Sequence, residues 1–128
     1  MEINEKLPSL NFEISFIGTS YAPNGEGIQT IKPIASKLGI TSKVIEQTDR
    51  VGYFEAISII QHADILFIPG STDPAYTASK IYPYILADKP IIACFHENSS
   101  VVDILGGCTK TNVITFNSKS SNVDTADR

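Results

Sequence analysis

The sequence has no tryptophan, one methionine and two cysteines among its 128 residues. Cys94 and Cys108 form no CxxC pair and have no cluster of histidines near them, so neither a disulfide framework nor a zinc site is indicated. No apolar run approaches the roughly 20 residues that cross a bilayer. The first residues also lack the basic and apolar regions of a signal peptide. These absences favour a cytoplasmic protein with reduced thiols.

Basic side chains are few, with 10 Lys and Arg against 14 Asp and Glu and a net charge of -4. Non-specific nucleic-acid binding and docking to anionic membranes both need a concentrated basic surface, so both are disfavoured. The length and the 42% hydrophobic content suit one globular domain. The last dozen residues contain almost no apolar side chain. We therefore expect one domain at 1–116 and a polar tail or linker at 117–128.

Five short segments have the β-branched and aromatic composition of strands. They are Phe12–Ile17, Lys43–Gln47, Ile65–Pro69, Pro90–Phe95 and Asn112–Phe116. The third and fourth are apolar at successive positions rather than at alternate ones. That pattern is typical of strands covered on both faces, as in the middle of a parallel sheet.

Helical patterns lie between these strands. An apolar stripe with helical spacing is formed by Tyr53, Ala56, Ile57, Ile60 and Ala63. A second helix is predicted from Thr30 as N-cap to an end at Gly39, with Pro33 tolerated in its first turn. Further helices are predicted over Ser79–Ala87, with Ser79 as N-cap, and over Ser99–Leu105, ended by Gly106-Gly107.

Alternating strands and helices predict right-handed βαβ units and a parallel sheet. We expect an α/β fold of three layers with a mainly parallel five-stranded sheet. Such sheets bind ligands beyond the carboxyl ends of their strands. The loops to consider are Gly18–Gly27, Thr48–Gly52, Gly70–Ser79 and His96–Ser100.

Between Val51 and Leu105 the features follow a specific order. They are Ala63-Asp64 ending a helix, an apolar strand reaching Pro69, Ser79-Lys80, Tyr84, the turn at Lys89-Pro90 and the strand Ile91-Ile92-Ala93. This order resembles the C-terminal, nucleotide-sugar-binding half of GT-B glycosyltransferases, especially the retaining enzymes of family 4. Phe16–Thr19 is similar to the strand and glycine turn that begin the central part of that domain. The resemblance covers roughly Phe12–Phe116 and implies a Rossmann-like domain, one half of a GT-B fold.

The chain departs from the family's pattern in three places. Counting back from Pro90, the family's two donor-site glutamates fall at Ala75 and Pro83, and neither is a carboxylate. The glycine of the family's Gly-Lys-Pro turn is Asp88. Pro83 has no group that binds a ribose hydroxyl, so Asp73 or Tyr82 would have to substitute.

The resemblance implies the donor-binding domain of a hexosyltransferase-type enzyme. It would move a sugar from a nucleotide-diphosphate sugar to a glycan or lipid-linked acceptor, as in polysaccharide biosynthesis. It implies no metal and no other cofactor, because helix N-termini and basic side chains carry the diphosphate charge. The partner would be the acceptor-binding N-terminal half of the GT-B fold, which has no room in 128 residues. We therefore expect a domain, a fragment or one subunit of a split enzyme, inactive by itself.

Ser79 and Lys80 are the strongest local candidates for binding the donor. A capped helix start leaves N–H groups for a diphosphate, and a lysine adds a mobile positive charge. The plainer interpretation is an ordinary capped helix with a solvated lysine. The full predicted donor-binding set is Gly18, Thr19, Arg50, Asp73, Ser79, Lys80 and Tyr82, and no catalytic residue is assigned.

Plainer interpretations stay open for the other members of the set. Gly18-Thr19 either lets the backbone approach a ligand or makes a strand-end turn. Arg50 either contacts a phosphate or base, or pairs with Asp49 or Glu55. Asp73-Pro74 is a common turn dipeptide.

For the tyrosines and histidines, too, packing or surface positions are weighed against contact with a ligand. Tyr82 and Tyr84 are two residues apart on a helix, so at least one is expected to pack against the protein. His62 is expected on the surface. His96, at the carboxyl end of its strand, is expected to face the ligand edge.

Two other functions remain open. The first is a non-catalytic, flavodoxin-like binding or regulatory module, which the missing glutamates favour. The second is a sugar-nucleotide epimerase with the same architecture, for which no acidic and histidine set can be assigned.

Overall fold

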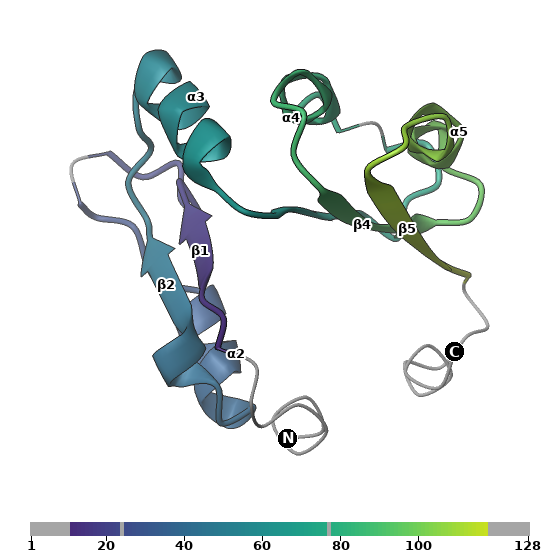
Figure 1. The fold of residues 1–128 in the computed structure, drawn as a ribbon. Helices are drawn as coiled ribbons and strands as arrows, with labels where there is room; N and C mark the ends of the chain where they lie inside the picture. The colour runs from purple at the N-terminus through teal and green to yellow at the C-terminus, as the bar shows by residue number, and fades with distance from the viewer. Residues whose placement is uncertain (1–10, 24, 77, 118–128) are drawn as a thin grey trace. The chain divides into compact units, whose positions relative to one another are not determined.

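The computed structural model describes residues 11–23, 25–76 and 78–117. The chain divides into two compact units, Met1–Tyr53 and Phe54–Arg128. Strands and helices alternate along it (Figure 1) as β1 (Ile14–Ile17), α2 (Ile31–Lys37), the 3-10 turn η1 (Thr41–Lys43), β2 (Val44–Gln47), α3 (Tyr53–His62), β3 (Leu66–Pro69), α4 (Ile81–Leu86), β4 (Ile91–His96), α5 (Ser100–Gly106) and β5 (Thr111–Phe116). The predicted α/β class and parallel pairing are confirmed. Of the tail predicted at 117–128, residues 118–128 lie outside the described residues.

The strands form two small sheets instead of one. β1 pairs with β2, and β3, β4 and β5 form a second sheet in that order. The predicted five-stranded sheet is therefore wrong for the described residues. A β-branched and aromatic composition indicates that strands exist, but strand pairing is decided by hydrogen bonds between residues far apart in the sequence, which no local pattern contains.

In the first unit, α2 connects two adjacent parallel strands. Its N-cap is Thr30 as predicted, although the threonine side chain makes no capping bond. The helix ends before Gly39, whose φ of 70° is the left-handed conformation expected of a glycine that follows a helix. Lys43 belongs to the 3-10 turn, so the second strand starts one residue later than predicted.

The core of the second unit lies on one face of its sheet. Alternate strand residues, including Ile68, Ala93 and Phe95, pack with Ile81 of α4 and Leu105 of α5. Figure 1 places α4 and α5 on the same side of β4 and β5, as two consecutive right-handed crossovers require. The end of α3 also reaches this core, through its half-buried Ile60.

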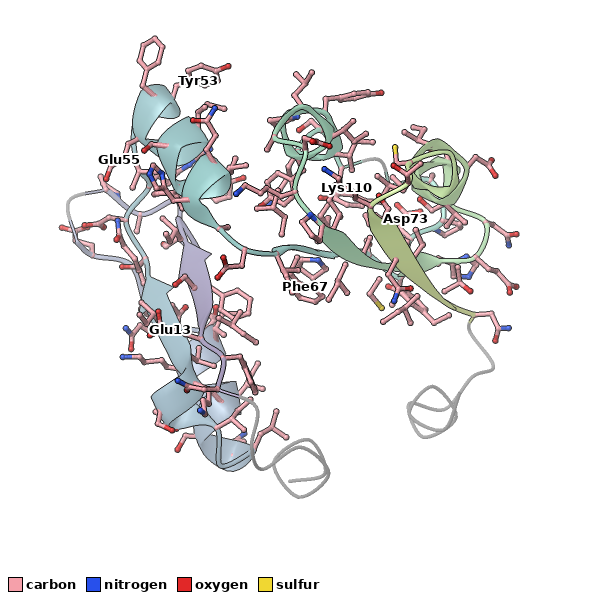
Figure 2. The ribbon with its side chains drawn as sticks, viewed as in Figure 1. Glu13, Tyr53, Glu55, Phe67, Asp73 and Lys110 are labelled. Atoms are coloured by element: carbon pink, nitrogen blue, oxygen red, sulfur yellow. The ribbon has the colours of Figure 1, made fainter. Side chains whose placement is uncertain are left out.

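The other face of this sheet is partly exposed. Phe67 is 44% exposed and lies on the side of the sheet away from α4 and α5 (Figure 2), and Ile114 of β5 is 40% exposed. The prediction of cover on both faces is therefore wrong for β3 in the described residues, whereas the outer face of β4 is half-buried at Ile92 and Cys94. A continuous apolar run allows a strand to be buried on both faces, but it does not provide the second layer of helices or strands that would bury it.

The one cap predicted from a serine, Ser79, is wrong, whereas Ser99, predicted only as the first residue of a helix, is a cap. Ser99 caps α5, because its Oγ accepts the Val101 amide at 3.3 Å. Ser79 does not cap α4, which begins two residues later with Lys80 at its N-cap and no side-chain capping bond. There the Ile81 amide donates to the Ala78 carbonyl at 3.2 Å, so a backbone turn replaces the serine.

Candidate functional site

The seven residues predicted to bind a donor are divided between the two units. Gly18, Thr19 and Arg50 belong to the first unit, and they follow the carboxyl ends of β1 and β2. The second unit holds the other four, in or directly after the connection from β3 to α4: Asp73, Ser79, Lys80 and Tyr82. Each unit therefore presents its own candidate group.

Gly18 makes the turn that follows β1. Its φ is 75°, and its amide donates to the Gln47 carbonyl at 2.9 Å, which extends the pairing with β2. A Cβ built on Gly18 would lie 3.5 Å from Arg50 Cα. The left-handed conformation thus favours glycine here, and the turn brings the predicted residues Gly18 and Arg50 side by side.

Arg50 is exposed, and its guanidinium carbon lies 5.0 Å from the centroid of the Tyr21 ring. This is the distance of a cation–π contact. Asp49 instead accepts the Gly25 amide at 3.0 Å, and no ion pair joins Arg50 to Asp49 or Glu55 in the described part of the chain. Of the two alternatives for Arg50, pairing with Asp49 or Glu55 is thus not seen in the described residues, and the guanidinium contacts the Tyr21 ring instead.

Thr19 turns inward. Its hydroxyl donates to Glu46 Oε1 at 3.0 Å, across the end of the β1–β2 pair. The same carboxylate accepts the backbone amides of Thr30 at 2.9 Å, Ile31 at 3.1 Å and Lys32 at 2.8 Å. Glu46 is thus the cap of α2 and leaves Thr19 no hydroxyl proton for a ligand.

Sequence reasoning missed Glu46. The sequence feature that could have indicated its role is a glutamate two residues after Val44 in an apolar strand, where both side chains point to the same face. In the structure that face is the buried one, since Val44 and Glu46 are buried while Ile45 between them is exposed. Glu46 is only 6% exposed. Burial opposes its ionisation, but the amides of Lys32, Thr30 and Ile31 and the Thr19 hydroxyl outweigh it, so the pKa of Glu46 lies below its ordinary value.

In the second unit, Asp73 organises the start of the loop after β3. Its Oδ1 accepts the Ala75 amide at 2.9 Å, and its carbonyl accepts the Tyr76 amide at 3.1 Å. Ser99 Oγ donates to the Tyr76 carbonyl at 3.3 Å, which ties this loop to the start of α5. Asp73 is therefore a turn residue, as the plainer interpretation held, and its Oδ2 has no partner among the described residues.

Ser79 and Lys80 are exposed at the start of α4. Tyr82 is 56% exposed, whereas Tyr84 is half-buried against the core, and burial raises the pKa of Tyr84. The prediction that one of the two tyrosines packs is confirmed for Tyr84. Pro83 supplies no amide to the first turn, so few N–H groups there are available to an anion.

The two histidines occupy different environments. His62 lies on the surface of α3, where its ring nitrogen contacts the Ser58 carbonyl at 2.7 Å, as predicted. His96 ends β4, is 7% exposed and accepts the Asn98 amide on Nδ1 at 3.2 Å.

One hollow of about 340 Å³ opens at Asn11, Phe12, Glu13, Ser42 and Lys43. It lies at the amino ends of β1 and β2, whereas parallel sheets bind their ligands at the carboxyl ends. Lys43 Nζ donates to Asn11 Oδ1 at 3.2 Å and lies 5.5 Å from the Phe12 ring centroid, so its charge is already engaged. We do not assign a site to this hollow.

Within residues 11–23, 25–76 and 78–117, no three His, Cys, Asp or Glu side chains gather as a metal site would require. Across the same residues, none of the helices has the length and apolar character that crossing a membrane demands. Comparisons of the chain with protein-family models, with curated proteins and with solved structures found no match.

Proposed function

We propose that this chain is the donor-binding domain of a GT-B glycosyltransferase. It would bind a nucleotide-diphosphate sugar, and the acceptor would be held by a separate N-terminal GT-B domain. The observation that carries the proposal is the second unit's order of elements: a helix ending before Ala63-Asp64, a parallel strand, a loop with Lys80, and a sharp turn at Asp88 before the next parallel strand.

The turn at Asp88 is the most specific part of this support. The family resemblance places a glycine there, and Asp88 adopts a φ of 54°, the left-handed region that favours glycine. Lys110 Nζ donates to Asp88 Oδ2 at 2.7 Å and to the Asp88 carbonyl at 3.1 Å, which helps to hold the aspartate in this conformation. A backbone conformation that glycine adopts freely therefore occurs at the position of the family's glycine, which supports the comparison with a Gly-Lys-Pro turn.

The replaced glutamates limit how the nucleotide could be held. Ala75 gives its amide to Asp73, and Pro83 has neither a carboxylate nor an amide to offer. Asp73 Oδ2 and the exposed Tyr82 hydroxyl are the polar groups of this connection that could contact a ribose. Losing a hydrogen bond to a charged group costs about 1.5–3 kcal/mol, so we expect weak donor binding with little base selectivity.

A panel of nucleotides and nucleotide sugars, measured by thermal shift and saturation-transfer NMR, tests the proposal directly. A ligand at a hundredfold excess over its dissociation constant should raise the free energy of unfolding by about 2.7 kcal/mol. Mixed with donor and acceptor but no other protein, the chain should not transfer sugar. Positioning donor and acceptor together contributes roughly 7–11 kcal/mol to such catalysis, and one domain does not supply it.

Replacing Lys80 separates phosphate binding from folding. Lys80 is exposed and makes no ion pair among the described residues, so Lys80→Ala should leave the melting temperature nearly unchanged. It should weaken binding of UDP or GDP by several-fold, while uridine and guanosine bind both forms equally. Lys37→Ala, at the exposed end of α2, is the matched control and should leave binding unchanged. Equal affinity of Lys80→Ala and wild type for the diphosphates would remove Lys80 from the proposed site.

The second candidate is a non-catalytic, flavodoxin-like module. Glu46 favours it, because a side chain of the protein already occupies the N-terminus of α2, where such folds commonly bind phosphate. This alternative predicts that no nucleotide sugar stabilises the chain in the same panel. Stabilisation by nucleotide sugars beyond that given by the nucleosides would exclude it.

A further inference from the structure

The connection from β3 to α4 carries the polar groups of the proposed donor site in the second unit, and its two halves are held in different ways. The second half is fixed by packing, because Ala78 is 2% exposed and belongs to the core of this unit. The Ala78 carbonyl also accepts the Ile81 amide at 3.2 Å. Ser79 and Lys80, which lie between these two residues, are therefore held by the core and by a backbone turn.

The first half, residues 71–76, is exposed or half-buried. Its own hydrogen bonds centre on Asp73, which accepts the amides of Ala75 and Tyr76. Between described residues, only one hydrogen bond joins 71–76 to another part of the chain: Ser99 Oγ donates to the Tyr76 carbonyl at 3.3 Å. The turn at Asp73 is therefore attached by a single hydrogen bond between its two ends.

The Ser99 hydroxyl is itself fixed from two sides. Its oxygen accepts the Val101 amide of α5 at 3.3 Å, and the Ser99 amide donates to the His96 carbonyl at the end of β4 at 2.9 Å. With the acceptor side of the hydroxyl used by the helix, its proton is left for the Tyr76 carbonyl. Ser99 is only 3% exposed, so water competes little for this donor.

We propose that Ser99 is a positioning residue. Through the Tyr76 carbonyl it holds the turn at Asp73, and this keeps the Asp73 carboxylate ordered for contact with the ribose of a nucleotide. An ordered group binds more tightly because less freedom is lost on binding. The inference deepens the proposed function and rests on it for the identity of the ligand. It also separates Asp73, which depends on Ser99, from Lys80, which Ala78 anchors independently.

Ser99→Gly tests the attachment while keeping α5. Glycine is tolerated at a helix N-cap, so this variant should melt close to the wild type although the hydroxyl is gone. The amides of Ala75 and Tyr76 should exchange with solvent several-fold faster, as measured by NMR. The Leu105 amide, inside α5, should exchange as in the wild type. Ser99→Thr keeps the hydroxyl and should retain slow exchange at Ala75 and Tyr76.

Thr30→Gly is the matched control for a glycine at a helix start. Thr30 is the N-cap residue of α2 in the first unit, and its side chain makes no capping bond. This variant should leave the exchange of the Ala75 and Tyr76 amides unchanged, and the affinity for UDP or GDP as well.

Double-variant cycles show which binding group depends on Ser99. Ser99→Gly should bind UDP or GDP about five-fold more weakly, as expected when one hydrogen bond to the ligand is weakened. Asp73→Asn keeps an oxygen for the Ala75 amide but removes the charge, so in this background Ser99→Gly should cost less than about two-fold. In the Lys80→Ala background it should still cost about five-fold, because the two contributions are independent.

The outcomes distinguish this inference from the proposed function. If UDP or GDP binds and Ser99→Gly changes neither exchange nor affinity, the positioning role is wrong and the donor function stands. An equal loss of affinity with and without Asp73→Asn would also overturn the inference, because Asp73 would not be the group that Ser99 orders. If no nucleotide binds the wild type, the donor function fails and amide exchange decides alone. Faster exchange in Ser99→Gly then keeps Ser99 as the residue that holds the Asp73 turn, and unchanged exchange removes it.

Discussion

Glu46→Ala should lower the free energy of unfolding by about 3 kcal/mol, although Glu46 is one of 14 acidic residues in an acidic chain. The substitution removes the acceptor of three backbone amides, from Thr30, Ile31 and Lys32, and of the Thr19 hydroxyl. Glu46→Gln keeps the volume but not the charge, and its NH2 group would face donors, so we expect a loss of about 2 kcal/mol. Urea unfolding followed by circular dichroism measures both. Glu13→Gln, at an exposed position, should change stability by less than about 0.5 kcal/mol.

The pH dependence gives an independent check. The folded-state pKa of Glu46 lies below 4.5, its value without the protein environment, so its contribution is fully present above that pH. It is lost as the pH falls through the folded-state pKa. The wild type should therefore lose stability more steeply than Glu46→Gln below about pH 4.5, and the two curves should converge. Parallel curves, or a Glu46→Gln variant as stable as wild type at pH 7, would contradict this account of the α2 cap.

Glu46 also explains why the candidate site was only partly predictable. The sequence around it, Val44–Gln47, indicates a strand, and a glutamate in a strand is by default a solvent-facing residue. Only the register with β1, which sets Phe16 against Glu46, and the approach of the α2 N-terminus make it an internal cap. Both depend on residues 14 or more positions away. Hence Thr19, predicted to face a ligand, is engaged inside the protein.

The order of helices and strands could be predicted because it depends on local signals. The stripe that ends at Ala63 and the glycine at Gly39 predicted where two helices occur, and a short helix was predicted at Ser99–Leu105 where α5 lies. The same reasoning failed at Ser79, because Pro83 and the Ala78–Ile81 turn shift the start of α4. It also failed for the faces of β3, since an apolar run carries no information on which other segment covers it.

Gly70 is a second position whose importance the sequence did not reveal. It follows β3 directly, and its amide donates to the Cys94 carbonyl at 2.7 Å, which continues the ladder with β4. A Cβ at Gly70 would overlap the Cys94 carbonyl oxygen and would lie 2.8 Å from Phe95 Cδ1. Phe95 is among the largest fully buried side chains, so neither the ring nor the strand has room to move.

Gly70→Ala should therefore be the most destabilising single-methyl substitution in the second unit, with an expected loss of about 3 kcal/mol in the free energy of unfolding. The reason is overlap and not backbone conformation, because Gly70 does not have a left-handed φ.

Gly106→Ala is the matched control. It adds the same methyl group at the end of α5, where a Cβ meets nothing within 4 Å, and should stabilise the chain by up to about 1 kcal/mol. Urea unfolding of both variants should thus give shifts of opposite sign. Adding Phe95→Leu to Gly70→Ala separates the two contacts, because a smaller side chain relieves the contact with Phe95 Cδ1 but leaves the overlap with the Cys94 carbonyl oxygen. The two losses should therefore sum to more than the loss in the double variant, while the double variant stays less stable than Phe95→Leu alone. A Gly70→Ala variant as stable as wild type would mean that the β3–β4 edge adapts and that Gly70 is not required there.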